Sequence, residues 1–251
     1  MIAVDGPAGA GKSSAARGVA TELGLRYLDT GAMYRALTWW LLTQRLDVTD
    51  PAVVAANARR PVIEVGTDPH RPAITVDGRD LSGQIRSRAV SNAVSAVASV
   101  PEVRAHLVAQ QQGILARACA AGHGIVAEGR DIGTVVAPRA VVKVFLTASE
   151  EARAFRRSAD LASDPGATPG VTRDENKRRD RADAPQTVMA SDAIEVDSTV
   201  LSLDEVIALI VQVAGERGFR LRHGGEPGQR GKRQVPENSV PPSRADTARL
   251  S

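Results

Sequence analysis

A glycine-rich segment near the start of the chain has the residue types and spacing that bind the phosphates of a nucleotide. It fits the P-loop pattern G-x-x-x-x-G-K-S and lies between an apolar run and a helical pattern. Its glycines let backbone N–H groups face an anion at the positive end of the following helix. Lys12 should reach the β- and γ-phosphates, and the Ser13 hydroxyl should ligate Mg²⁺. The residues expected to contact the nucleoside triphosphate here are Gly6, Pro7, Ala8, Gly9, Ala10, Gly11, Lys12, Ser13 and Ser14.

The rest of the chain argues against two other uses of a bound triphosphate. A GTPase switch needs an N-K-x-D motif that reads the base, and the nearest match, NKRRD from Asn176, has one residue too many. A motor or helicase ATPase would usually need a longer chain, and no apolar run here ends in the acidic D-E pair that many of them have.

Two polar clusters point instead to an acceptor that carries a phosphate. DTGAMYR begins at Asp29 and EGRDIGT begins at Glu128, each directly after an apolar run. Open α/β sheets bind their ligands at the carboxyl ends of parallel strands. Arg35 and Arg130 would supply two guanidinium forks for a second anion, and Asp131 a carboxylate for a base, a sugar or the magnesium site.

A third cluster is rich in arginine. Arg153, Arg156 and Arg157 have helical spacing, and a Gly/Pro-rich stretch, ASDPGATPGV from Ala162, follows them. Five further basic residues come next: Arg173, Lys177, Arg178, Arg179 and Arg181. Beside a P-loop, two such helical segments joined by a mobile loop predict a lid whose arginines close over the transferring phosphoryl group.

Composition explains part of the arginine excess. Lysine occurs four times among 32 basic residues, so 28 are arginine. A GC-rich codon bias would explain the origin of this excess but not how each arginine is used. A guanidinium nevertheless matches phosphate oxygens and stays charged at any working pH. The formal net charge is +3, of which +2 lies in residues 223–251, so nucleic acid is not an expected partner.

Other counts exclude several classes of protein. The single cysteine, Cys119, cannot form an internal disulfide and is expected to be a small buried side chain. One cysteine and four scattered histidines give no metal-ligand spacing, and seven aromatic residues leave little for stacking nucleic-acid bases. No apolar run approaches the roughly 20 residues that span a bilayer, so we expect no membrane partner and a cytoplasmic protein.

Apolar runs alternate with amphipathic segments, which predicts an α/β fold with a parallel sheet. The runs are IAV at Ile2, RYLD at Arg26, GIVAEG at Gly124, VVKVFL at Val141 and AIEVD at Ala193. Residues 61–78 read instead as an antiparallel hairpin, followed by two helical patterns. The last helix should begin at a Ser202–Glu205 capping box and stop at Gly218.

The domain limits follow from these patterns. Residues 1–222 should form one P-loop domain, with an insertion at about 57–100 and the lid at about 153–186. Residues 223–251 contain Pro and Gly but few large apolar residues, which predicts a disordered tail.

Four motifs together resemble the bacterial cytidylate kinases: GPAGAGKSS, DTGAMYR, SNAVSAVASVPEVR and EGRDIGTVV, over about residues 1–217. The resemblance implies a three-layer αβα P-loop kinase that transfers the γ-phosphoryl group of ATP to CMP or dCMP in pyrimidine nucleotide metabolism. The insertion would bind the monophosphate, and Mg²⁺ would accompany ATP.

The resemblance also implies roles for individual residues. Lys12, Arg130, Asp131 and Arg179 would be catalytic, and Arg153 and Arg157 would contact ATP from the lid. Arg35 and Arg130 would hold the CMP phosphate, and Ser95, Arg104 and Asp131 would read cytosine. Thr30, Arg179 and Asp183 would contact the pentose.

The sequence departs from the family in the lid. Gln186 stands where the family has another phosphate-binding arginine, and the following segment is a few residues short. Either Arg178 or Arg181 substitutes, or the acceptor phosphate is held more weakly. Two other readings stay open: a P-loop kinase for UMP, AMP or a small metabolite, and a non-catalytic nucleotide-binding protein that uses its basic tail. We expect a monomer.

Overall fold

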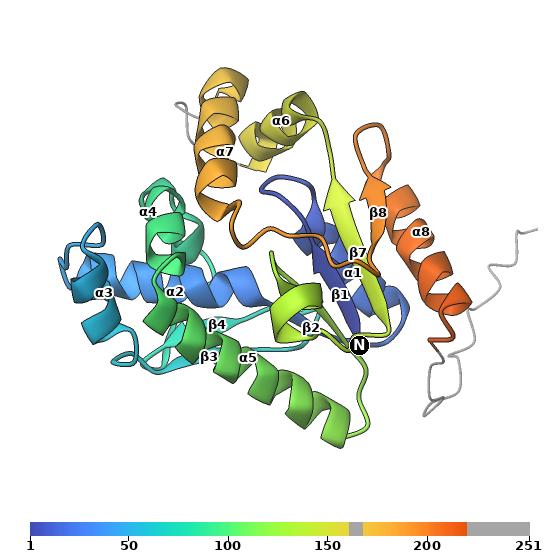
Figure 1. The fold of residues 1–251 in the computed structure, drawn as a ribbon, viewed down its shortest axis with the longest axis horizontal. Coiled ribbons are helices and arrows are strands. Elements are labelled where there is room, and N and C mark those ends of the chain that lie inside the picture. Colours follow the sequence, from blue (N-terminus) through green and yellow to red (C-terminus); the bar gives the residue numbers. More distant parts are fainter. Residues whose placement is uncertain (161–167, 220–251) are drawn as a thin grey trace, which may run out of the picture. The chain divides into compact units, whose positions relative to one another are not determined.

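A five-stranded parallel sheet forms the centre of the protein (Figure 1). The computed structural model describes residues 1–160 and 168–219. The strand order is β2-β6-β1-β7-β8, and every neighbouring pair is parallel. The strands are β1 (Ile2–Asp5), β2 (Arg26–Asp29), β6 (Ile125–Glu128), β7 (Val142–Thr147) and β8 (Ile194–Asp197). All five predicted runs are therefore confirmed as strands.

Helices cover both faces of this sheet, because strands buried on two sides need two apolar layers. On one face, α1 (Lys12–Glu22) and α8 (Leu203–Glu216) share a core with side chains from the strands. On the other face, the core includes α2 (Thr30–Thr43), α5 (Pro101–Ala120) and the helical turn η2 (Ile132–Val136). The fold is the expected three-layer α/β arrangement. The capping box of α8 and a left-handed Gly218 are also confirmed.

The predicted hairpin is part of a three-stranded antiparallel sheet, β3-β4-β5. The elements here are α3 (Pro51–Asn57), β3 (Ile63–Val65), β4 (Ile74–Val76), β5 (Arg79–Asp80), η1 (Gln84–Arg86) and α4 (Arg88–Ala98). The sequence pattern missed β5 because it has only two residues, both exposed.

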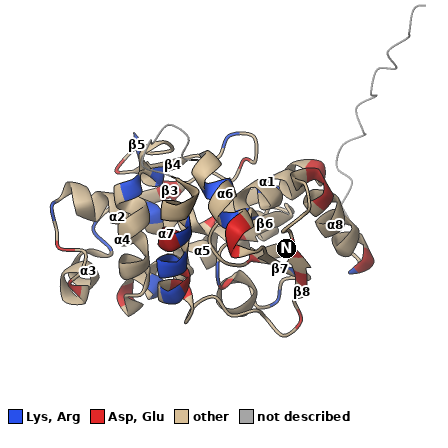
Figure 2. Ribbon diagram, turned by 90° about the horizontal axis from the view of Figure 1, so that it is seen from above, with Lys and Arg blue, Asp and Glu red and all other residues tan. Residues whose placement is uncertain are grey.

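Two helices carry the arginine-rich segments, α6 (Glu150–Asp160) and α7 (Pro169–Asp183). The basic positions of α7 lie along the helix in Figure 2. The loop expected over residues 162–171 ends earlier than predicted, since Thr168 caps α7 and Pro169 occupies its first turn. Residues 161–167 lie outside the described part of the chain, and so does the predicted tail.

One sequence expectation about the core is wrong. Cys119 is exposed, because it lies on the outer side of the last turn of α5. The four buried positions of α5 end at Leu115. Within the described residues, no helix is long and apolar enough to cross a bilayer.

Candidate functional site: a two-ended cleft above the parallel sheet

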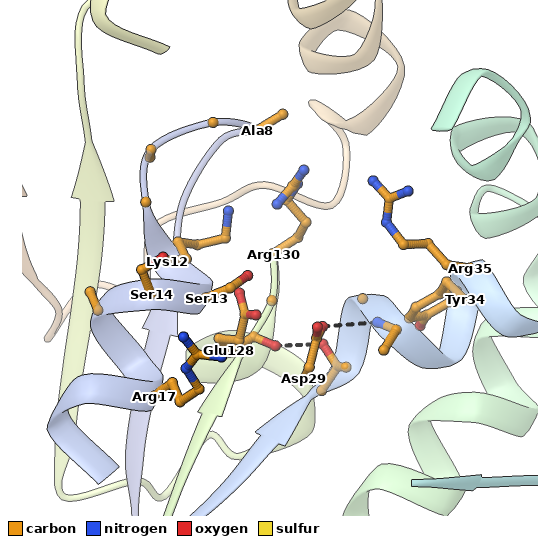
Figure 3. A pocket seen from close by; sticks show the side chains of 18 of the residues that line it. Ala8, Lys12, Ser13, Ser14, Arg17, Asp29, Tyr34, Arg35, Glu128 and Arg130 are labelled. Atoms are coloured by element: carbon orange, nitrogen blue, oxygen red, sulfur yellow. Dashed lines mark hydrogen bonds between the residues drawn. The ribbon is translucent and has the colours of Figure 1, made fainter. Parts of the chain in front are cut away.

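A cleft of about 840 Å³ lies at the carboxyl ends of the parallel strands. One end is the loop between β1 and α1, and its lining runs from Ala8 to Ala15. The other end is lined by α2, by the antiparallel sheet and by α4 and α5. Figure 3 shows Lys12, Arg130 and Arg35 pointing into this space from three different elements.

The P-loop has the backbone that its glycines permit. Gly6, Gly9 and Gly11 all have positive φ, and a Cβ on Gly6 would lie 2.1 Å from the carbonyl oxygen of Leu146. The Lys12 ammonium donates to the Pro7 carbonyl at 2.8 Å, so its side chain folds back along the loop. Burial and the nearby guanidinium of Arg130 lower the pKa of Lys12. An anion in the loop would offset both effects.

Two arginine-rich helices hold the P-loop from outside. Arg153 of α6 donates to the Ala8 carbonyl at 3.0 Å, and Asp180 of α7 accepts from the Ala8 amide at 3.3 Å. Arg153 and Asp180 also form an ion pair with each other. Arg153 is buried and is not among the residues that line the cleft, so in this structure it contacts the P-loop rather than the cleft.

A buried carboxylate positions the loop that follows β6. Asp5, at the end of β1, accepts from the amides of Ile132 and Gly133 at 2.8 and 2.7 Å. Burial raises the pKa of Asp5, and these two hydrogen bonds oppose that rise. The loop is thereby fixed, and Arg130 reaches the P-loop, where its Nη1 donates to the Gly6 carbonyl at 3.1 Å.

Glu128 is a second buried carboxylate, at the end of β6 beside Ser13 and Lys12. Tyr27 donates a hydrogen bond to it at 3.0 Å. Burial and the charge of Asp29 raise the pKa of Glu128, while Lys12 and hydrogen bonds from Ser13 and Tyr27 oppose the rise. Ser13 and Glu128 together offer the oxygen donors that Mg²⁺ prefers. Among the described residues, no cluster of three or more His, Cys, Asp or Glu side chains forms a separate metal site.

The far end of the cleft gathers positive charge. Arg35, Arg130, Arg157 and Arg179 all line it, and each comes from a different element or loop. Burial, with Arg179 and Arg157 nearby, lowers the pKa of Arg35 to about 9. Burial and Arg130 lower the pKa of Arg179 to about 10. Half-buried cations that repel one another indicate an anion site, because a bound anion would stabilise all of them.

Individual contacts show how these arginines are held. Arg35 donates to the Ile85 carbonyl at 3.1 Å, and Arg130 pairs with Asp183 at 3.2 Å. Within the described part of the chain, the Arg179 Nε is one of the buried polar atoms that have no hydrogen-bond partner. It is therefore available to a ligand.

A polar pocket lies beyond the arginines. Arg104, in the first turn of α5, forms an ion pair with Asp131. The buried Ser95 hydroxyl of α4 lines the same cleft and has no partner among the described residues. An ion pair and an unpaired hydroxyl can together read the polar edge of a base.

Most of the predicted site residues therefore meet in one cleft. Thr30 lines it, although its hydroxyl already donates to the Glu128 carbonyl at 2.7 Å. Gln186 lines it too. Gly6 and Pro7 do not, but they accept hydrogen bonds from Arg130 and Lys12.

Comparison with known proteins decides the family. The family model described as cytidylate kinase matches residues 2–216. The chain belongs to the cytidylate kinase family.

Individual relatives agree with this membership. The cytidylate kinase of Streptomyces griseus is 52% identical over 222 residues, covering 86% of this chain and 94% of its own. Those of Nocardia farcinica and Geobacillus kaustophilus are 47% and 44% identical, again over 86% of this chain and over 94% and 96% of theirs. A sugar kinase structure from Janibacter sp. HTCC2649 has a TM-score of 0.44 at 15% identity, covering 85% of this chain and 93% of its own, too low a likeness to carry an argument.

Some residues of this cytidylate kinase family site were not assigned from the sequence. Glu128 was part of a quoted motif but was given no role. Its position at the end of a strand beside the P-loop strand could have identified it as a site residue. Ser91 was likewise part of a quoted motif without a role, and Asp5 gave no signal, because the groups that they bond lie far away along the chain. Arg156, which the lid prediction included without a specific contact, also lines the cleft, beside Ser198, to which it donates at 2.9 Å.

Proposed function

We propose that this member of the cytidylate kinase family transfers the γ-phosphoryl group of ATP to CMP and dCMP, giving ADP and CDP or dCDP. One observation carries the proposal. A P-loop faces a group of four arginines within one cleft, and a pocket with an ion pair and an unpaired hydroxyl adjoins that group. Two anions and one polar base fit this arrangement.

The proposed donor end is the P-loop. Backbone amides from Gly9 to Ser13 would surround the triphosphate, and Lys12 would leave the Pro7 carbonyl to contact its β- and γ-oxygens. Ser14, in the first turn of α1, would also contact ATP. Of the lid residues, Arg157 would act inside the cleft, and Arg153 would act by holding Ala8.

The proposed acceptor end uses the arginines. Arg35 and Arg130 would bind the CMP phosphate, with Arg179 at the transferring group and Asp183 near the pentose beside Thr30. Ser95, Arg104 and Asp131 would read cytosine. The positioned cations would align the two nucleotides and stabilise the charge of the phosphoryl group in flight, so no covalent intermediate is needed.

Mg²⁺ fits the oxygen donors that the chain presents. Ser13 would hold it, with Glu128 close by, and the ion would neutralise charge on the phosphate oxygens. All the groups named so far belong to one chain, so the proposal requires no second subunit. We place this reaction in the cytoplasm, with nucleotides rather than nucleic acid or membrane as partners.

The experiment is a panel of CMP, dCMP, UMP and AMP, each assayed for ADP release from ATP and Mg²⁺. CMP and dCMP should be the best acceptors, and chelating Mg²⁺ should remove the activity. Better use of UMP or AMP would overturn the acceptor assignment. A variant that lacks residues 223–251 tests the non-catalytic alternative. That alternative would be favoured if the full chain binds ATP without releasing ADP in the presence of CMP, and if the truncated chain no longer binds ATP.

A further inference from the structure

Ser91 of α4 lies where the two ends of the site meet. Its side chain is buried, and its hydroxyl oxygen accepts hydrogen bonds from two guanidinium groups. Arg35 Nη1 donates at 2.9 Å, and Arg157 Nη2 donates at 3.1 Å. Arg35 belongs to α2, beside the proposed acceptor phosphate, whereas Arg157 belongs to α6, in the predicted lid. Ser91 itself does not line the cleft, so it would act through the arginines.

The Ser91 hydroxyl joins two positively charged groups that would otherwise repel each other. A hydroxyl has two lone pairs, so one oxygen can accept from both cations. The two cations repel each other, and the charge of Arg157 is one of the causes that lower the pKa of Arg35. An anion bound at Arg35 would offset the repulsion and thereby favour the position of Arg157. The state of the acceptor end would then reach Arg157 through the Ser91 oxygen.

A second contact joins the same helix to the lid. Arg88 lies one turn before Ser91 on α4, and its Nη2 is 2.8 Å from Glu175 Oε1 of α7. Residues three apart share one face of a helix. Among the described residues, the first two turns of α4 therefore contact α6 through Ser91 and α7 through Arg88.

We propose that Ser91 is a positioning residue, which couples the acceptor-binding Arg35 to the lid Arg157 so that a bound monophosphate places the Arg157 guanidinium at the transferring group. This inference rests on the proposed function. The inference adds to the proposed function a positioning residue, Ser91, through which binding of CMP would place a lid arginine at the phosphoryl group of ATP.

The first test is Ser91→Ala. It should leave the thermal unfolding temperature near that of the parent, because Ala favours a helix. A hydrogen bond to a charged group accounts for about tenfold in rate, so kcat at saturating CMP and ATP should fall about tenfold. The matched control is Ser99→Ala, at the exposed end of α4, where the hydroxyl bonds only locally to Ala96. A Ser91→Ala kcat within twofold of the parent would overturn the proposal.

The second test shows whether Ser91 acts through Arg157. In the Arg157→Ala background, adding Ser91→Ala should change kcat by less than threefold, since the group that Ser91 positions is already absent. A larger loss in that background would mean that Ser91 acts elsewhere and would overturn the coupling. The parent enzyme in the same assay keeps the two ideas apart: if it does not phosphorylate CMP, the proposed function fails, whereas a failure limited to the Ser91 variants affects only this inference.

Discussion

The two ends of the cleft are built in different ways. At the proposed donor end, one continuous segment from Ala8 to Ala15 supplies much of the lining, and its glycines and alanines offer mainly backbone. At the acceptor end, Arg35, Arg130, Arg157 and Arg179 come from α2, the loop after β6, α6 and α7. The donor end depends on local geometry, and the acceptor end depends on the assembly of distant elements.

This difference has an energetic consequence. Backbone amides in a loop fixed by glycines carry partial charges and need little reorganisation when an anion binds. Without a bound anion, the four guanidiniums at the proposed acceptor end repel one another. Binding of the substrate phosphate would therefore remove an unfavourable electrostatic free energy. Substitutions at the donor end should therefore mainly lower kcat. Substitutions at the acceptor end should both lower kcat and raise the KM for CMP.

The largest expected effect compares one cation from each end. Lys12→Ala and Arg130→Ala should each lower the rate of CMP phosphorylation by about a hundredfold or more, since each removes a charge from the transferring group or its anchor. Steady-state kinetics should show a loss mainly in kcat for Lys12→Ala, and a loss in kcat with a higher KM for CMP in Arg130→Ala. Thermal unfolding checks that the fold persists, and exposed Arg139→Ala is the control. A rate within threefold of the parent would remove the role given to that residue.

A smaller effect is expected in the base pocket. Ser95→Ala should lower kcat/KM for CMP about tenfold, because its unpaired hydroxyl would lose a partner on the base. The KM for ATP should not change. Competition between CMP and UMP measures the selectivity, and an unchanged ratio of the two would show that Ser95 does not read the base.

The smallest effect concerns protons at the donor end. The pKa of Lys12 in the empty protein is lowered to about 7, and a bound triphosphate should raise it, since the anion stabilises the ammonium. At a pH between the pKa of Lys12 without ATP and its pKa with ATP bound, Lys12 takes up a proton when ATP binds. ATP affinity should therefore be about fivefold weaker at pH 8 than at pH 7. Calorimetry in buffers of different ionisation enthalpy measures the uptake. Lys12→Arg, whose charge is permanent, should show none; equal uptake in both proteins would assign the proton to another group.

The same contrast explains what could be predicted from the sequence. The P-loop was complete as a local pattern, and the five strands were apparent because each is a short apolar run beside an amphipathic segment. The partners of Asp5 and Ser91 could not be predicted, because a carboxylate at the end of one strand and a hydroxyl on a helix give no sign of which distant group they will meet. Arg153 illustrates the limit: it was predicted to contact ATP, but nothing in the sequence shows that its guanidinium bonds the Ala8 carbonyl and pairs with Asp180. Cys119 was misplaced because a run of alanines gives no clear apolar face.

The two hydrogen bonds at Ala8 give the enzyme a native reporter. The Ala8 amide donates to Asp180 of α7, so its hydrogen can exchange with solvent deuterium only when that carboxylate withdraws. Ala8 lies in the donor loop, yet its exchange rate should measure the motion of an arginine-rich helix. One backbone proton would thus record how often α7 departs from the P-loop.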